Sequence, residues 1–197
     1  MPDTTISRPN TKDELRDHAR RLFARHGYEG VSMRDIAGSV GVRQSAIYNH
    51  FPSKQHLLVD LMVSHMERLL DAMRTAVKSH ETPAEQLKAF AHFHVTYHID
   101  QPEDVFLAYM ELRSLEEEGR KVVLPLRDAY ERTLRDILKA GHANGDFQIG
   151  DPAVVSRALL AMMTGVTVWF KDDGKLDRQA VADTYVKTAM QSVGYAS

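Results

Sequence analysis

Residues 31–58, VSMRDIAGSVGVRQSAIYNHFPSKQHLL, carry the pattern that most limits how this chain can fold. Ser32 and Asp35 have the spacing of a capping box, and apolar residues follow at the positions of an amphipathic helix. Gly41 stands where the chain must reverse, because a residue without Cβ accepts a positive φ at little steric cost. A second short helix ends at Phe51–Pro52. The pattern predicts a helix, a tight turn and a second helix.

The second helix of this pair presents polar side chains on its outer face, and the next helix begins at Ser53 with Lys54 in its first turn. Such donors and acceptors suit base edges and phosphates, and the positive end of a helix favours a phosphate. We therefore expect DNA contacts from Arg43, Gln44, Ser45, Tyr48, Asn49, His50 and Lys54, and from Arg34 in the basic cluster around this unit. Two alternatives stay open: the unit is an ordinary three-helix packing unit with solvated polar residues, or His50 alone is a buried, hydrogen-bonded packing residue.

Residues 11–60 resemble the N-terminal domain of the TetR family of bacterial one-component repressors. The resemblance rests on Ala19, Leu22, Phe23, Gly27, Tyr28, Ser32, Ile36, Ala37, Gly41, Val42, Ile47, Tyr48, His50, Phe51, Ser53, Lys54 and Leu57. It implies that Ser32, Tyr48 and Lys54 hold phosphates of the DNA backbone.

The same resemblance implies that Gln44, Ser45 and Asn49 face the bases. The sequence departs from the family pattern at two positions of the second helix. Arg43 stands where a capping serine is common, and Ser45 stands where glycine or proline is common. The resemblance therefore does not specify the contact made at the start of this helix.

Composition is compatible with a regulator that works in the cytoplasm. The net charge is −2, but residues 1–60 hold 9 Lys and Arg against 7 Asp and Glu, whereas the remainder holds 16 against 20. The positive field is therefore local to the predicted DNA-binding unit. The chain has no cysteine, so thiolate chemistry and disulfides are excluded. Its N-terminus shows no signal peptide, and we expect no stretch apolar enough to cross a membrane.

Helix start and stop signals recur along the whole chain, so the predicted fold class is all-α. Capping boxes or capping residues open helices at positions 11, 53, 82, 151 and 177, and a further helix opens at Gln101–Pro102 and ends near Gly119. A long segment follows over residues 120–144, with Pro125 as a late start or a kink. Another helix reaches from Pro152 to Phe170.

We expect three segments: a disordered arm over residues 1–10, a three-helix DNA-binding domain with a helix-turn-helix over 11–58, and a helical ligand-binding and dimerisation domain over 59–197. The helix over residues 53–79 joins the two domains, so we expect a ligand to act on the DNA-binding helices through its tilt.

The last two predicted helices carry more apolar surface than one small domain needs, which favours a homodimer. The residues concerned are Ala158, Leu159, Leu160, Ala161, Met162, Gly165, Val166, Val168, Val181, Tyr185, Ala189 and Val193. TetR-like proteins pair these helices as a four-helix bundle. The alternative is that the same residues belong to the internal core.

The C-terminal half also resembles TetR-like repressors that control fatty-acid and sterol catabolism and sense acyl-CoA thioesters. The residues that carry this resemblance are Glu111–Leu115, Arg127, Tyr130, Gly145–Phe147, Trp169–Lys171 and Gly174. An acyl-CoA needs an apolar channel and cations for its phosphates. The expected effector-binding residues are Phe93, Met110, Arg113, Arg127, Met162, Met163 and Trp169. Plain core packing is the alternative for the methionines and aromatics.

His94 and His98 share a helix face, as a metal-binding pair would, but only Asp100 and Glu111 are candidates for a third ligand, so we expect neither a metal nor a cofactor. No phosphate loop or nucleophile motif supports an enzyme. The sequence predicts a regulator, most simply a repressor, that binds a palindromic operator as a dimer and is released by a small molecule. The alternative is a DNA-binding protein without an effector response.

Overall fold

The computed structural model of the chain describes residues 11–195, and within that range it contains helices and no strand, which confirms the all-α prediction. The elements are α1 (Thr11–His26), α2 (Met33–Val40), α3 (Gln44–Tyr48), α4 (Lys54–Lys78), α5 (Pro83–Asp100), α6 (Pro102–Met110), the 3-10 helix η1 (Glu111–Ser114), α7 (Glu117–Ala143), α8 (Pro152–Thr164), α9 (Val166–Trp169) and α10 (Arg178–Ser192). The predicted arm over residues 1–10 lies outside the described residues.

The helix-turn-helix consists of α2 and α3 with the turn between them. The Ser32 side chain accepts a hydrogen bond from the Asp35 backbone N–H, and the Asp35 carboxylate accepts one from the Ser32 backbone N–H, so the predicted capping box is confirmed. Gly41 ends α2 with a φ of 78°, a left-handed conformation that favours glycine. The chain therefore turns where the sequence predicted.

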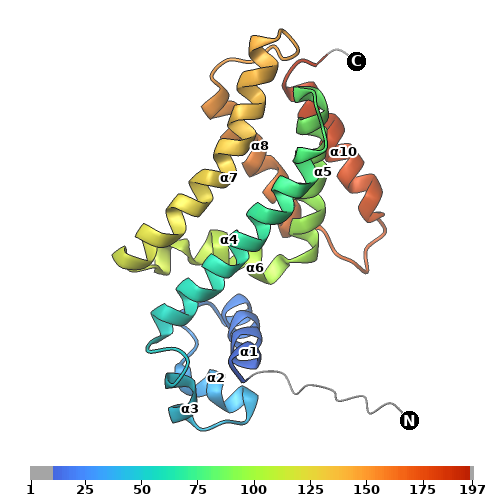
Figure 1. The fold of residues 1–197 in the computed structure, drawn as a ribbon. Helices are drawn as coiled ribbons and strands as arrows, with labels where there is room; N and C mark the ends of the chain where they lie inside the picture. Colours follow the sequence, from blue (N-terminus) through green and yellow to red (C-terminus); the bar gives the residue numbers. More distant parts are fainter. Residues whose placement is uncertain (1–10, 196–197) are drawn as a thin grey trace, which may run out of the picture.

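Helix α4 belongs to both halves of the molecule, as Figure 1 shows. Ser53 caps it, and its apolar residues recur at helical spacing and are buried. The buried residues between Leu57 and Met62 join a core built on α1 to α3. Those between Met66 and Val77 join a second core, which is built on α5, α7, α8 and α10 and is called the main core below. Because one rigid helix belongs to both cores, the two halves are mechanically connected.

The segment after α6 differs from the prediction. The expected helix from Gln101–Pro102 to Gly119 stops at Met110, and α7 begins already at Glu117. Gly119 lies inside α7, where a Cβ would come within 2.8 Å of the Val59 side chain of α4. This glycine therefore serves close helix packing, and reading it as a stop signal was wrong. Pro125 lies within α7.

The C-terminal helices are capped as predicted by Asp151 and Asp177. The expected helix from Pro152 to Phe170 is divided at Gly165 into α8 and α9. Contrary to the sequence prediction, the stretch Pro152–Trp169 does reach the length and hydropathy of a membrane-crossing helix, although only 22% of it is buried in this chain. This is weak evidence for a membrane, because an apolar helix that covers another protein surface has the same composition.

Figure 1 shows α1 to α3 gathered at one end of the molecule and α5, α7, α8 and α10 gathered at the other, with α4 running between them. α6 and η1 cross α4 where the two groups meet. Leu107 of α6, together with Leu115 and Val123, is buried in the core of the first group. The junction therefore consists of α4, α6, η1 and the start of α7.

Candidate DNA-binding surface and ligand cavity

The outer face of the helix-turn-helix carries an open hollow of about 590 Å³ between the start of α2 and the exposed side of α3. Five of the predicted DNA-binding residues line it: Ser32, Arg34, Gln44, Tyr48 and Lys54. The buried Ile47 anchors α3 from behind, so polar side chains of this five-residue helix point outward. Side chains from α2, α3 and α4 thus meet on one concave surface that can follow a convex DNA backbone.

The two short helices of this surface begin differently. Ser32 holds Asp35 through its hydroxyl, and these hydrogen bonds keep the pKa of the Asp35 carboxyl below its usual value. Arg43 stands at the N-terminal cap of α3 but makes no side-chain capping bond. Arg43 is exposed, which leaves its guanidinium accessible to a phosphate.

Lys54 has a structural role that the sequence analysis missed. Its ammonium donates hydrogen bonds to the carbonyl oxygens of Tyr28 at 3.0 Å and Val31 at 3.1 Å, and it lies 4.0 Å from the centroid of the Tyr28 ring. An ammonium has three protons, so one remains for a further acceptor. Lys54 therefore holds the loop before α2 in place. The same ammonium group lies on the surface that we propose for DNA binding.

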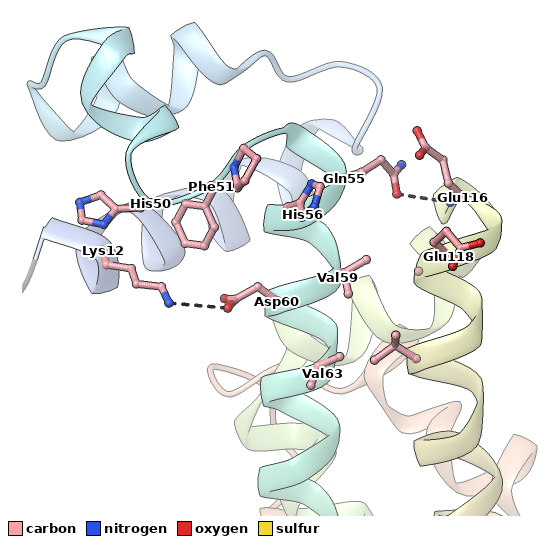
Figure 2. Close-up of a pocket in the computed structure, with 13 residues that line it drawn as sticks. Lys12, His50, Phe51, Gln55, His56, Val59, Asp60, Val63, Glu116 and Glu118 are labelled. Atoms are coloured by element: carbon pink, nitrogen blue, oxygen red, sulfur yellow. Dashed lines mark hydrogen bonds and ion pairs between the residues drawn. The ribbon is translucent and has the colours of Figure 1, made fainter.

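The remaining predicted contact residues, Arg43, Ser45, Asn49 and His50, are exposed but do not line this hollow. His50 is not the buried packing residue considered above. It lies instead on a second hollow of about 500 Å³, between the helix-turn-helix and the start of α7 (Figure 2).

This second hollow is apolar at its base, with polar groups at its edges (Figure 2). Lys12 of α1 lies 3.9 Å from the Asp60 carboxylate of α4. The Gln55 side chain accepts a hydrogen bond from the Glu116 backbone N–H at 3.3 Å and so connects α4 to the beginning of α7. The hollow marks the outer seam between the two groups of helices.

A partly open pocket of about 120 Å³, called the inner cavity below, lies among α4, α6, α7 and α8, with Leu124 and Asp128 exposed at its edge. Its lining comes from α4, α6, α7 and α8: His65, Met66, Leu69, Tyr109, Leu124, Arg127, Asp128, Tyr130, Glu131 and Leu160. Arg127, one of the predicted effector-binding residues, lies with its guanidinium 4.6 Å from the Tyr109 ring centroid and donates a 2.7 Å hydrogen bond to the Ala108 carbonyl oxygen. The cavity therefore borders directly on α6.

Three histidines are buried beside this cavity. His94 is bonded on both ring nitrogens, to the Tyr130 hydroxyl and to the Thr164 hydroxyl, each at 3.0 Å. Within the described part of the chain, the ring nitrogens of His65 and His98 have no hydrogen-bond partner. Burial lowers the pKa of His65 to about 4 and that of His98 to about 3, and it holds the pKa of His94 well below its usual value, so all three are neutral at pH 7.

An open hollow of about 410 Å³ lies next to Tyr109. It is lined by Tyr109, Met110, Leu112, Arg113 and Arg120. Two of the predicted effector-binding residues, Met110 and Arg113, lie here, and both are exposed. Because Tyr109 lines both spaces, this hollow and the inner cavity are neighbours.

The other predicted effector-binding residues do not line the inner cavity or this hollow. Phe93 and Met162 are partly buried against the main core, and Met163 lies within it. Trp169 is 45% exposed, and its ring stacks on Tyr185 with 6.4 Å between centroids. The structure therefore places Trp169 on the outer face of α9 and α10.

The two candidates for a third metal ligand are engaged elsewhere. Asp100 forms an ion pair with Arg178, and Glu111 accepts hydrogen bonds from the Tyr28 backbone N–H and the Ser114 hydroxyl. Among residues 11–195, no group of three or more histidine, aspartate or glutamate side chains is arranged to hold a metal ion.

An exposed polar helix-turn-helix, joined by one long helix to an all-helical domain with a partly open cavity, is the architecture of a DNA-binding regulator with a second helical domain. Residues 15–61 match the family described as "Bacterial regulatory proteins, tetR family", and residues 80–193 match the family described as "Tetracyclin repressor-like, C-terminal domain". The chain belongs to the TetR family of transcriptional regulators, which are not enzymes.

Individual relatives cover nearly the whole chain. The transcriptional repressor KstR2 of Mycolicibacterium smegmatis is 25% identical over 98% of this chain and 95% of its own length. The structure of a tetR-family regulatory protein from Rhodococcus RHA1 superposes with a TM-score of 0.90 at 26% identity, covering 96% of this chain and all of that one. AibR, solved with isovaleryl coenzyme A and operator DNA, superposes with a TM-score of 0.85 at 25% identity, covering 91% and 97%.

Proposed function

We propose that this protein is a homodimeric repressor that binds a palindromic operator and is released from it by an acyl-CoA thioester. The observation that carries the proposal is the presence, in one chain, of an exposed polar helix-turn-helix surface and the inner cavity that borders on the junction with it. Such a regulator acts on DNA inside the cell, and we place it in the cytoplasm.

On the DNA side, α3 enters the major groove and the hollow around it receives the backbone. We assign Ser32, Tyr48 and Lys54 to phosphates, because they line the hollow on three different helices or their caps. The Ser32 hydroxyl then exchanges its hydrogen bond to the Asp35 carboxylate for one to a phosphate. Gln44 and Asn49 are assigned to base edges, since amide side chains form bidentate bonds with adenine. The exposed side chains Arg34, Arg43, Ser45 and His50 complete the contact surface.

Exposed apolar side chains on α8, α9 and the segment before α10 support the homodimer. Val154, Val168, Trp169 and Leu176 are exposed, as are Ala158 and Ala161. Other residues predicted for the interface, Leu159, Val166, Val181, Ala189 and Val193, are buried within one chain and belong to its core. We therefore assign the interface to the exposed subset, where two copies of α8 can approach closely over alanine.

The acyl-CoA assignment is supported by two neighbouring spaces of different character. The inner cavity is partly apolar and suits an acyl group, while the open hollow next to Tyr109 holds the cations Arg113 and Arg120, which suit phosphates. AibR, a similar protein, has been solved with isovaleryl coenzyme A. We accordingly keep Arg113 and Arg127 as effector-binding residues and place Trp169 with the dimer face.

The proposal is tested by selecting the preferred DNA sequence and then adding CoA thioesters of increasing acyl length. We expect a palindromic consensus, a dimer on each site, and release by one class of acyl-CoA. By linkage, the operator should weaken binding of that acyl-CoA by the same factor. Free CoA serves as the control. If no thioester changes operator affinity while the palindrome is still bound, the effector class is wrong and the DNA-binding assignment stands.

The base contacts are tested with variants on the same operator. Gln44→Ala and Asn49→Ala should relax sequence preference at particular positions at a cost of roughly 1–3 kcal/mol for each bidentate contact, whereas Tyr48→Phe should weaken all sequences alike. An unchanged consensus for both alanine variants would contradict the assignment of the base-reading residues.

A further inference from the structure

Histidine side chains lie at the inner cavity, and a hydrocarbon chain alone could not form hydrogen bonds with them. His65 lines the cavity and is 1% exposed, and the fully buried His98 of α5 lies near enough for a charge on His65 to act on it. Within residues 11–195, all four ring nitrogens of these two histidines are without a hydrogen-bond partner. His94, on the same helix as His98 and stacked on it with 3.7 Å between ring centroids, has both nitrogens bonded. The missing bonds are therefore specific to two of the three imidazoles.

Buried polar atoms without partners are uncommon, because each loses its bonds to water and receives nothing in return. An apolar residue of similar size would stabilise the free protein at either position. The presence of these unpartnered imidazoles beside a cavity indicates that the missing hydrogen-bond partner is a group that enters the cavity.

The charges around the cavity limit what that group can be. Arg68 and Arg127 lie close enough to His65 to help lower its pKa, so a cation is disfavoured there. The lining also holds the carboxylates Asp128 and Glu131, of which Glu131 is paired with Arg157 at 3.3 Å. With Arg127 in the same lining, its charges are mixed and favour neither an anion nor a cation. A neutral imidazole carries one donor and one acceptor, which suits an uncharged oxygen group.

We propose that the inner cavity recognises a neutral oxygen function of the effector, a hydroxyl or a carbonyl, through the imidazole of His65 with His98 as the second polar group near it. The inference rests on the proposed function only in taking this cavity as the effector site. It requires that the bound effector place an uncharged oxygen, such as a thioester carbonyl or a hydroxyl on its apolar part, next to His65.

The recognition is tested with small probes that need no CoA. Cyclohexanone and methylenecyclohexane have nearly the same shape and differ in one oxygen, so we titrate both into the full-length protein and follow the imidazole resonances by NMR with labelled histidine. We expect cyclohexanone to shift the His65 and His98 signals and to bind about tenfold more tightly, the effect of one buried hydrogen bond. In His65→Leu the two probes should bind alike.

A ligand-free measurement provides the second arm. His65→Leu should raise the thermal unfolding midpoint of the free protein, because it removes unpartnered polar atoms, whereas the matched control His94→Leu should lower it by removing two satisfied bonds. Equal binding of the two probes, tighter binding of cyclohexylammonium or cyclohexanecarboxylate, or a lowered midpoint in His65→Leu would each overturn the inference. Failure of acyl-CoA to release the operator affects only the proposed effector class, since neither arm uses CoA.

Discussion

The role of several residues in this protein depends on the segments they contact and not only on the type of side chain. Lys54 and Arg127 are both cations that suit an anionic partner, yet each is also bonded to backbone carbonyl oxygens of a neighbouring segment. Gly119 and Gly141 both allow a close approach that a Cβ would block. At these positions a substitution changes a neighbouring element as well as the residue itself.

The packing at Gly141 predicts that a larger residue there destabilises the protein. A Cβ there would overlap the ring of Phe147, which is buried and cannot move aside cheaply. Gly141→Ala should therefore lower the free energy of unfolding by about 1–3 kcal/mol, measured by denaturant titration. The control is Gly38→Ala in α2, where nothing lies within 4 Å and alanine should stabilise the helix by roughly 0.5–1 kcal/mol. Equal effects at the two sites would contradict the packing argument.

The buried histidines predict how stability depends on pH. The pKa of His65 falls to about 4 and that of His98 to about 3, while unfolding returns each to about 6.5. Below pH 6.5 the unfolded chain binds protons that the folded protein excludes, so stability is complete above pH 6.5 and decreases as the pH falls toward 4.

Each of these histidines, and His94 with them, should contribute a slope of up to about 1.4 kcal/mol per pH unit in that window. The measurement is the free energy of unfolding at several pH values between 7 and 4.5. His65→Leu should reduce the slope by one histidine's share. A slope unchanged by that variant would show that His65 is already protonated in the folded protein.

At the level of elements, α6 and η1 connect the ligand cavity to the DNA-binding helices. Tyr109 and the Ala108 carbonyl of α6 contact Arg127 at the cavity. At the other side Asp104 of α6, which is 3% exposed, lies 3.3 Å from both Arg20 of α1 and Arg68 of α4. Glu111 of η1 accepts the Tyr28 backbone N–H after α1. A shift of α6 is therefore transmitted to α1 as well as to α4.

Asp104→Asn tests this connection. The amide cannot neutralise two guanidinium groups, so the free energy of unfolding should fall by roughly 1–3 kcal/mol, and the effect of effector on operator affinity should weaken. The control is Glu117→Gln, which disrupts only an exposed pair with Lys121 and should leave both quantities unchanged. If Asp104→Asn responds to the effector like the wild type, coupling runs through α4 alone.

At the level of the whole molecule, the apolar outer face of α8 and α9 indicates assembly. Only 22% of the stretch Pro152–Trp169 is buried within one chain, although its composition is apolar enough for a membrane. Val168, the most exposed of its large side chains at 88%, lies on that face. A second copy of the chain is the partner that this surface fits in our proposal.

Val168→Asp should accordingly convert the dimer to monomers at micromolar concentration, as measured by sedimentation, and reduce operator affinity because each monomer holds one half-site. The control is Val122→Asp on α7, which is also exposed but lies at the seam hollow away from this face. If the Val168→Asp protein remains a dimer, the interface lies elsewhere on the molecule.

The sequence by itself determined the class of the fold and most helix boundaries, because these depend on local chemistry. Ser32 with Asp35 and Thr82 with Glu85 form capping boxes wherever they stand at that spacing, and Gly41 turns the chain by its own conformational freedom. The residues that we propose for DNA contact could be listed for the same reason, since they lie within one short stretch.

Only the tertiary structure decided what depends on distant neighbours. Gly119 reads as a helix end in sequence, but Val59 on another helix makes it a close-packing position. Trp169 reads as a pocket residue and is stacked on Tyr185 at the surface. His65, on α4, had no local pattern to distinguish it, and its role follows from the cavity that α6, α7 and α8 close around it. The surroundings of these residues depend on packing between segments far apart in the chain, and the local periodicity of the sequence carries no information about that packing.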